Sequence, residues 1–278
     1  LLWPTPQTGA ALYGGTGNLR QLRKLALAGV ADLEDQAVLV SGGGSGIGAD
    51  LVRGFVAQGA KVAFLDIAEE PSLALVEELN ATARHPVQYF KTDLRNLDEI
   101  KDSITKAADA VGNFKVLVNN AAWDDRHDID TVTSEYWDNN HAINLKQVFF
   151  VTQAALPYLR KAQNASIINF SSVSYLLHMG DLPVYGTAKA GLVGLTKTLA
   201  GRLGPENIRV NAIVPGMIVT ERQLKLWLTE EGMAKTTDRQ CIKRILTGKD
   251  IAGPVLFLAS ESSGGMSAQA IHVDGGLF

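Results

Sequence analysis

From about Asp35 to its end, the chain alternates between short apolar segments and segments of helical periodicity, and this pattern narrows the possible folds most. The apolar segments are rich in β-branched residues and largely continuous, as expected for strands buried on both faces of a sheet. They span residues 37–41, 62–66, 87–90, 116–119, 166–171, 209–213 and 270–273. Helical patterns lie between them, among others at 47–58, 96–111, 134–160 and 185–203. Such alternation over about 240 residues predicts an α/β fold, a single doubly wound domain with about seven parallel strands and helices on both faces.

Residues 1–32 do not continue this alternation. The stretch 1–29 contains no acidic residue but has Arg20, Arg23 and Lys24. We interpret 1–32 as an N-terminal extension, either a mobile or interface-forming arm or a start placed upstream of the domain, and 33–278 as the folded domain. A transit peptide is disfavoured because residues 1–29 contain no serine and have two prolines.

The composition excludes several classes of protein. The 278 residues are 46% hydrophobic and carry a net charge of −3, so the chain lacks the electrostatic footprint of a nucleic-acid or anionic-membrane binder. No apolar run approaches the roughly 20 residues that span a bilayer. Cys241 is the sole cysteine, which leaves no internal disulfide and no cysteine cluster for a structural metal. We expect a cytoplasmic protein that uses no metal.

A glycine-rich run joins the first predicted strand to the helix after it. It contains Gly42, Ser45, Gly46, Ile47 and Gly48. Glycines in this position let the backbone turn tightly and approach a pyrophosphate, which then lies at the helix N-terminus. The run therefore predicts dinucleotide binding in a Rossmann-type domain.

Asp66 ends the second predicted strand, eighteen residues after Gly48. A carboxylate there can accept hydrogen bonds from the ribose hydroxyls and would repel a 2′-phosphate. No Arg or Lys follows Asp66 directly, so we predict NAD rather than NADP and assign Asp66 and Ile67 to the cofactor site.

Two further strand ends contribute to this prediction. Asp93 and Leu94 follow the third strand and could bracket the adenine. Asn119, Asn120 and Ala121 follow the fourth, where side-chain amides can hold either the cofactor or the strand-end backbone. We include Asn119 and Ala121 among the cofactor residues, with the structural role of the asparagine pair left open.

Tyr185 and Lys189 stand four residues apart on a predicted helix, which places an ammonium group beside a phenol on one face. A positive charge within a few ångströms favours the phenolate and lowers the phenol pKa. Such a pair is suited to moving a proton on or off an alcohol oxygen.

Taken in order, these motifs resemble the short-chain dehydrogenase/reductase family, over about residues 33–278. The carrying positions are the glycine loop, Asp66, Asp93, 119–121, Asn144, Ser172, Tyr185 with Lys189, 215–216 and 273–276. Within that family the chain is most similar to NAD-dependent sugar dehydrogenases of the D-xylose 1-dehydrogenase type. That likeness rests on the stretches 42–49, 64–68, 124–127, 136–138 and 222–223.

The resemblance implies a role for each matching residue. Tyr185 would be the general base in alcohol oxidation, and Lys189 would lower its pKa and bind the nicotinamide ribose. Ser172 would hold the reacting oxygen, whereas its neighbour Ser171 would point to the opposite face of the strand. Asn144 would support a water chain from Lys189 to solvent.

The same resemblance implies contacts beyond the catalytic group. Pro215, Gly216, Ile218 and Thr220 would clamp the nicotinamide carboxamide. The family usually forms homotetramers, so we expect a homotetramer here.

The substrate site is predicted from two segments. Trp123 and Asp125 belong to a polar loop after the fourth strand, at the edge where ligands of such sheets bind. Residues 216–245 interrupt the alternation, which predicts a lid that brings in Gln223. We assign Trp123, Asp125, Ser172, Tyr175, His178, Tyr185 and Gln223 to the substrate.

The predicted reaction is oxidation of an aldose at C1, a pentose such as D-xylose or L-arabinose, to the lactone with NAD. Three alternatives stay open. One is an NAD-dependent dehydrogenase of another small polyol or of a 2-keto-3-deoxy sugar acid. Another is a 3-ketoacyl reductase, which Asp66 disfavours, and the third is a catalytically silent NAD-binding sensor.

Overall fold

The computed structural model describes residues 33–278, and the N-terminal extension expected at 1–32 lies outside them. At its centre is a seven-stranded sheet in the order β3-β2-β1-β4-β5-β6-β9, with every neighbouring pair parallel. The strands are β1 (Ala37–Ser41), β2 (Lys61–Asp66), β3 (Gln88–Lys91), β4 (Phe114–Asn119), β5 (Ser166–Phe170), β6 (Arg209–Pro215) and β9 (Ala270–Val273). The doubly wound α/β fold expected from the alternation is confirmed.

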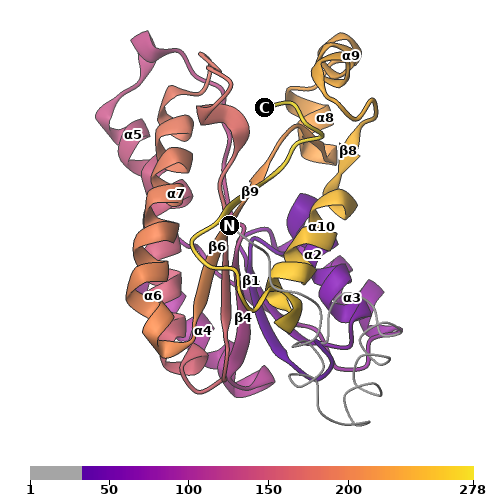
Figure 1. Ribbon diagram of the computed structural model, residues 1–278, viewed down its shortest axis with the longest axis vertical. Coiled ribbons are helices and arrows are strands. Elements are labelled where there is room, and N and C mark those ends of the chain that lie inside the picture. Colours follow the sequence, from indigo (N-terminus) through magenta and orange to yellow (C-terminus); the bar gives the residue numbers. More distant parts are fainter. Residues whose placement is uncertain (1–32) are drawn as a thin grey trace, which may run out of the picture.

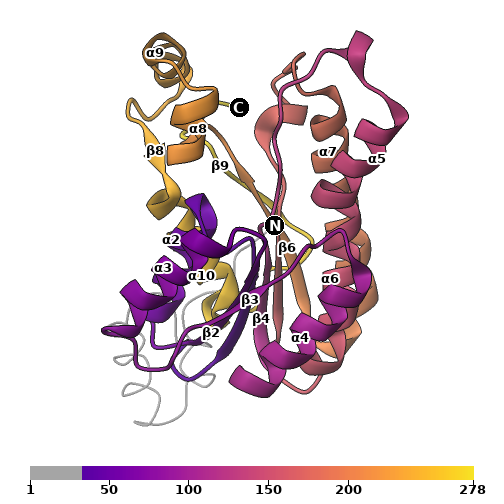
Figure 2. The same cartoon turned by 180° about the vertical axis from the view of Figure 1, so that it is seen from behind.

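Helices cover both faces of the sheet, as Figures 1 and 2 show from opposite sides. On one face lie α2 (Gly46–Ala57), α3 (Glu69–Asn80) and α10 (Gly248–Ala259). On the other lie α4 (Leu97–Val111), α6 (Gln147–Leu159) and α7 (Pro183–Leu203). Short 3₁₀ turns connect these elements at Ile129–Thr131, Val173–Tyr175, Gly204–Glu206 and Glu261–Ser263.

The core has two layers because side chains alternate along each strand. In β1, Val38 and Val40 pack among the residues on the α2 side, whereas Ala37 and Leu39 pack on the α4 side. All four are buried, and each fully buried Val or Leu side chain contributes about 1.5–3 kcal/mol. This double burial explains why the strands read as continuous apolar runs rather than as alternating ones.

The helix expected over 134–160 is interrupted. It consists of α5 (Ser134–His141), a π-helical turn (Ala142–Lys146) and α6. A π turn inserts an extra residue into the helical repeat and commonly occurs at functional sites. Here it contains Asn144, one of the predicted catalytic residues.

The 216–245 segment leaves the sheet. It contains β7 (Ile218–Val219), α8 (Glu221–Leu226) and α9 (Glu230–Arg239), and β7 pairs with β8 (Leu246–Thr247) in a separate two-stranded ladder. Figure 1 shows α8 and α9 beyond the carboxyl ends of the strands, above α10. This position places the segment beside the edge where the predicted site residues gather.

Candidate active site

A large cleft of about 1530 Å³ opens at the carboxyl ends of the strands. Its walls come from the loops after β1, β2, β4, β5 and β6 and from the 216–245 segment. The strand order reverses between β1 and β4, and open α/β sheets bind ligands in the crevice at such a point. The volume exceeds the roughly 300–1,000 Å³ of ordinary small-molecule pockets, so a dinucleotide and a small substrate can share it.

The loop into α2 is rich in glycine because its closely packed backbone leaves no space for larger side chains at these positions. Gly42 and Gly46 have φ angles of 65° and 53°, in the left-handed region that favours glycine. A Cβ atom on Gly48 would lie 1.8 Å from the carbonyl oxygen of Gly42. The helix therefore begins in direct contact with the loop backbone.

The N-terminus of α2 is open to an anion. Ser45 at the N-cap makes no side-chain hydrogen bond to the helix, and its first turn has no acidic residue. In contrast, α3, α4 and α10 each carry an acidic residue in their first turn. Ser45, Gly46, Ile47 and Gly48 all line the cleft, so the unpaired N–H groups and the positive end of the helix dipole lie at its wall.

Asp66 lies at the cleft wall and holds the glycine loop in place. Its carboxylate accepts hydrogen bonds from the Gly44 N–H at 2.8 Å and from the Ala68 N–H at 2.9 Å. Each oxygen keeps a further lone pair with which it can accept a ligand hydroxyl. Ile67 lies on the same wall and is 56% exposed.

Asp93 and Leu94 continue this wall after β3. The Asp93 carboxylate accepts hydrogen bonds from Arg95, with Nε at 2.9 Å and Nη2 at 2.6 Å. These hydrogen bonds hold the pKa of Asp93 below its ordinary value. The carboxylate is therefore ionised at neutral pH.

Asn119 is the one predicted cofactor residue that the structure places away from the cleft wall. It is 1% exposed, and its Nδ2 donates to Thr152 at 3.1 Å and to Asn169 at 2.9 Å. Asn120 takes the position expected for Asn119, since it lines the cleft and donates to the Gly42 carbonyl at 2.8 Å. The correction follows from the alternation of side chains at the strand end, a signal that the sequence contained.

Tyr185 and Lys189 lie one turn apart on α7 at the inner end of the cleft. The Lys189 Nζ lies 5.4 Å from the centre of the Tyr185 ring and donates to the Phe170 carbonyl at 2.8 Å. Ser172 lines the cleft beside Tyr185, and its hydroxyl lowers the pKa of Tyr185. Ser171 instead donates its hydroxyl to the Lys189 carbonyl at 2.7 Å, so the two serines point in different directions, as expected.

The electrostatics of this pair differ from the sequence expectation. Burial raises the pKa of Tyr185, and the nearby Asp124 carboxylate raises it further, whereas Ser172, Arg126 and Arg222 lower it. Burial also lowers the pKa of Lys189 to about 7. Desolvation dominates both shifts because it disfavours the charged form of each group, and the lowering of the Tyr185 pKa by Lys189 stays a prediction.

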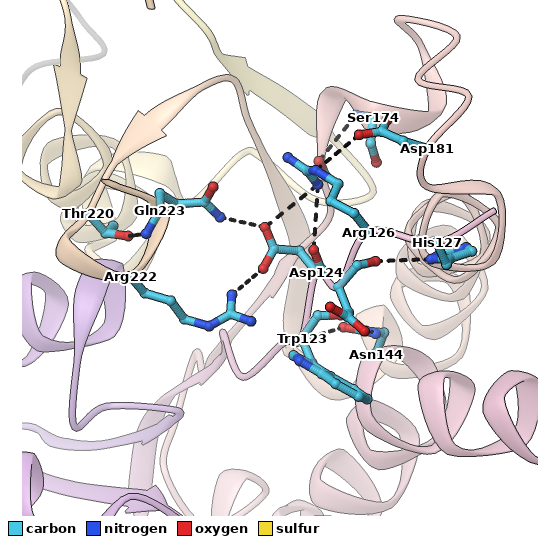
Figure 3. Close-up of polar contacts among 12 residues, drawn as sticks. Trp123, Asp124, Arg126, His127, Asn144, Ser174, Asp181, Thr220, Arg222 and Gln223 are labelled. Atoms are coloured by element: carbon cyan, nitrogen blue, oxygen red, sulfur yellow. Dashed lines mark hydrogen bonds and ion pairs between the residues drawn. The ribbon is translucent and has the colours of Figure 1, made fainter. Parts of the chain in front are cut away.

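The far end of the cleft is lined by a polar network that Figure 3 shows. Asp124, in the loop after β4, accepts hydrogen bonds from Arg222 and Gln223 on α8, one at each carboxylate oxygen. Arg126 lies on the other side of Asp124, with Nε 3.1 Å from the Asp181 carboxylate and its guanidinium 5.3 Å from the centre of the Trp227 ring. This network joins the β4 loop to the 216–245 segment across the cleft.

Comparison with known proteins shows which family the chain resembles. A family model described as Enoyl-(Acyl carrier protein) reductase matches residues 42–278. A probable galactose dehydrogenase of Rhizobium meliloti is 54% identical over 247 residues, covering 89% of this chain and 96% of that protein. A D-xylose 1-dehydrogenase of Caulobacter vibrioides is 45% identical over 244 residues, covering 88% and 96%.

A solved structure, a putative short-chain alcohol dehydrogenase from Sinorhizobium meliloti, superposes with a TM-score of 0.83 at 28% identity and covers 88% of this chain and 97% of its own. The chain belongs to the short-chain dehydrogenase/reductase family. It is an oxidoreductase of CH–OH groups that works with a nicotinamide cofactor. The resemblance inferred from the motifs is confirmed.

Membership of this family leads us to expect a clamp for the nicotinamide, and the residues predicted for it lie at the cleft wall. Pro215, Gly216, Ile218 and Thr220 all line the cleft. Gly216 donates its N–H to the Val273 carbonyl at 3.0 Å, and a Cβ there would lie 2.7 Å from Asp274. Thr220 caps α8, since its hydroxyl accepts the Gln223 N–H at 3.3 Å.

Asn144 lies behind the cleft wall. Its Oδ1 accepts the Trp123 N–H at 2.9 Å, and its Nδ2 donates to the Trp123 carbonyl at 2.9 Å and to Asn140 at 3.0 Å. Its hydrogen bonds in the structure thus position the loop after β4 and do not reach Lys189. The expected water chain from Lys189 stays a prediction.

The predicted substrate residues divide into two groups. Trp123, Ser172, Tyr185 and Gln223 line the cleft, as expected, together with Ala121 of the cofactor set. Asp125, Tyr175 and His178 are absent from the cleft wall as the described residues form it. The exposed His178 has a φ angle of 54°, and this left-handed turn leaves its neighbours Leu177 and Met179 at the wall instead.

Asp124 and Arg126, which lie at the centre of the polar network, belong to the loop expected at the substrate site but were not among the residues assigned to it.

Within residues 33–278, no cluster of acidic, histidine and cysteine side chains suitable for a metal ion occurs. Over the same residues, no helix has both the length and the apolar character needed to cross a bilayer.

Proposed function

We propose that this enzyme oxidises an aldose at its anomeric hydroxyl to the lactone, with NAD as the hydride acceptor. Pentoses such as D-xylose and L-arabinose are the expected substrates. The two relatives described above are named for galactose and for D-xylose, which supports an aldose. Galactose therefore joins the candidates.

The observation that carries this proposal is the polar network beside Tyr185. A sugar presents many hydroxyl groups, each a donor and an acceptor, and needs both kinds of partner held in fixed positions. Asp124 supplies acceptor oxygens, Arg126 of the same loop supplies donors, and Arg222 and Gln223 supply further donors from α8 on the opposite wall. Because Asp124 and Asp181 already neutralise the two arginines, a neutral polyol is favoured over a sugar acid.

The residues around Tyr185 fit the proposed step. Ser172 and Tyr185 would hold the anomeric hydroxyl, and the Tyr185 phenolate would take its proton. The nicotinamide, when bound, accepts the hydride from the carbon that carries this hydroxyl. Ser172, Arg126 and Arg222 each lower the pKa of Tyr185 and so favour its phenolate.

The preference for NAD is proposed from the charges around Asp66. Its carboxylate lies at the wall where the adenosine ribose is expected, and it would repel a 2′-phosphate. Arg53, which also lines the cleft, already pairs with Glu78 at 2.7 Å. The cation that could attract a 2′-phosphate is therefore neutralised within the protein.

The experiment that tests the proposal measures NADH absorbance when the enzyme and NAD meet a panel of alcohols. D-xylose, L-arabinose and D-galactose should give a rise, and xylitol, which has no anomeric hydroxyl, is the matched control. D-galactose and L-arabinose differ in their ring forms by one hydroxymethyl group. The ratio of their rates of NADH formation therefore tests whether the site has space for this group beside Trp123 and Trp227. A flat trace for every aldose would reject the sugar assignment.

Two expectations about the whole protein remain predictions. We expect a homotetramer, and a monomeric mass in light scattering would contradict it. We also expect a cytoplasmic location, which fractionation of the source cells would test.

A further inference from the structure

Helix α7, which carries Tyr185, begins without a cap of its own. Leu182 stands at the N-cap and has no polar side chain to offer, and Pro183 has no N–H. Val184 is therefore the first residue of the helix whose N–H needs an acceptor. In α4 and α8 the N-cap residues Asn96 and Thr220 meet this need themselves.

The missing cap is supplied by His127, from the loop after β4. Its Nε2 accepts the Val184 N–H at 3.1 Å, although the two residues are 57 positions apart in sequence. The His127 backbone N–H also donates to the Asp181 carbonyl at 3.0 Å, just before the helix. Figure 3 shows His127 on the side of Asp124 away from α8. His127 thus lies behind the cleft and does not line it.

The partners of His127 fix one tautomer. A backbone N–H can only donate, so Nε2 must carry a lone pair toward Val184. A backbone carbonyl can only accept, so Nδ1 must carry the proton toward the Asp125 carbonyl at 3.0 Å. The Tyr136 hydroxyl lies 2.8 Å from the same Nδ1 and accepts there as well. The arrangement requires neutral imidazole with the proton on Nδ1.

We propose that neutral His127 is a positioning residue for the reaction: it caps α7 from another element and thereby holds Tyr185, the next residue after Val184, in its catalytic position. Without an acceptor at this position, the Val184 N–H would have no partner and the first turn of α7 would loosen. This inference rests on the proposed proton transfer by Tyr185 but not on the identity of the sugar.

The groups around His127 hold the imidazole in place. On its own loop lie Asp125 and Arg126, and Arg126 pairs with Asp181 at 3.1 Å. From α5 comes Tyr136, whose ring centre lies 5.0 Å from that of His127. Both imidazole nitrogens thus have partners, which are backbone groups and a tyrosine hydroxyl.

The test compares two substitutions. His127→Gln keeps an amide oxygen near the position of Nε2 and cannot be protonated, whereas His127→Leu fills the volume without an acceptor. His127→Leu should lower kcat about tenfold, the equivalent of a lost helix cap, with NADH affinity unchanged. His127→Gln should restore most of this loss, because its amide oxygen can accept the Val184 N–H.

Two results would overturn the inference. Equal kcat in His127→Leu and the wild type would show that the cap does not position Tyr185. Equal kcat in His127→Gln and His127→Leu would show that an acceptor at this position has no effect on Tyr185. Hydrogen exchange of residues 182–189 should be faster in His127→Leu than in His127→Gln. The hydrogen-exchange measurement needs no substrate, so it can be interpreted even if no sugar in the panel is oxidised. Equal exchange in the two variants would also count against the inference.

Discussion

The two ends of the cleft are built in different ways. At the dinucleotide end, the backbone of the glycine loop forms much of the surface, and it is held by Asp66, which contacts Gly44, and by Asn120, which contacts Gly42. At the substrate end, charged side chains form the surface, and Asp124 meets Arg222 and Gln223 across 98 and 99 positions.

This difference indicates which part of the cleft can accept substitutions and which cannot. A backbone surface in van der Waals contact with itself has no freedom to accept a larger residue. A network of long side chains can rearrange, because each donor has other acceptors within reach. We therefore expect substitutions in the backbone-packed glycine loop to be costlier than substitutions of side chains at either end, with the proton-transferring group between the two ends costliest of all.

The largest effect is expected at Tyr185, the proton-transferring group between the two ends of the cleft. Tyr185→Phe removes the hydroxyl and should lower kcat by about 1,000-fold, the usual contribution of a general acid–base group. The NADH dissociation constant, measured by fluorescence titration, should be unchanged. Tyr175→Phe is the control, because Tyr175 does not line the cleft. Turnover at the wild-type rate in Tyr185→Phe would remove it from the mechanism.

The next largest effect is expected in the glycine loop. Gly48→Ala places a Cβ against the Gly42 carbonyl oxygen and forces the loop to move, so kcat/KM for NAD should fall about a hundredfold. The matched control is Gly54→Ala in the same helix, where a Cβ would meet Ala252 and Leu256 at 3.6 Å, an ordinary contact. Equal kinetics in the two variants would contradict the steric comparison.

A smaller effect is expected at the substrate end. Asp124→Asn weakens the hydrogen bonds to Arg222 and Gln223, so the KM for the sugar should rise about tenfold while that for NAD stays unchanged. Since the Asp124 charge raises the pKa of Tyr185, its loss lowers that pKa. The acid limb of the kcat–pH profile should therefore move to lower pH. Asp125→Asn is the control, and a limb that does not move would show that Asp124 is not coupled to Tyr185.

The smallest effect is expected at Asp66. Asp66→Ala removes the carboxylate that would repel a 2′-phosphate, so the ratio of kcat/KM for NAD to that for NADP should fall about fivefold. The variant also loses the hydrogen bond to Gly44, so kcat/KM for NAD itself should decrease. An unchanged ratio would place the ribose contact elsewhere.

Much of the fold and of the dinucleotide end could be predicted because both depend on local chain properties. Continuous apolar runs gave the positions of the seven sheet strands, and a glycine run after a strand predicted the loop into α2. The spacing of Tyr185 and Lys189 placed them correctly on one face of α7. Each of these signals lies within a few residues of the feature that it predicts.

The predictions that differed from the structure depended on the direction in which a side chain points rather than on the place of the residue in the fold. Asn119 and Asn120 occupy the same strand end, and only the pleat decides which of them lines the cleft. Asp124 and Asp125 present the same problem in the loop after β4. The raised pKa of Tyr185 likewise reflects burial, which the spacing to Lys189 does not reveal.

The sequence by itself determined the parallel sheet, the open helix N-terminus and the presence of a phenol one turn from a lysine, because short-range sterics and periodicity suffice for each. The tertiary structure alone decided which aspartate reaches α8 and that a histidine from another loop caps α7. Those contacts join segments far apart in the chain, and their geometry depends on the packing of all the elements between them.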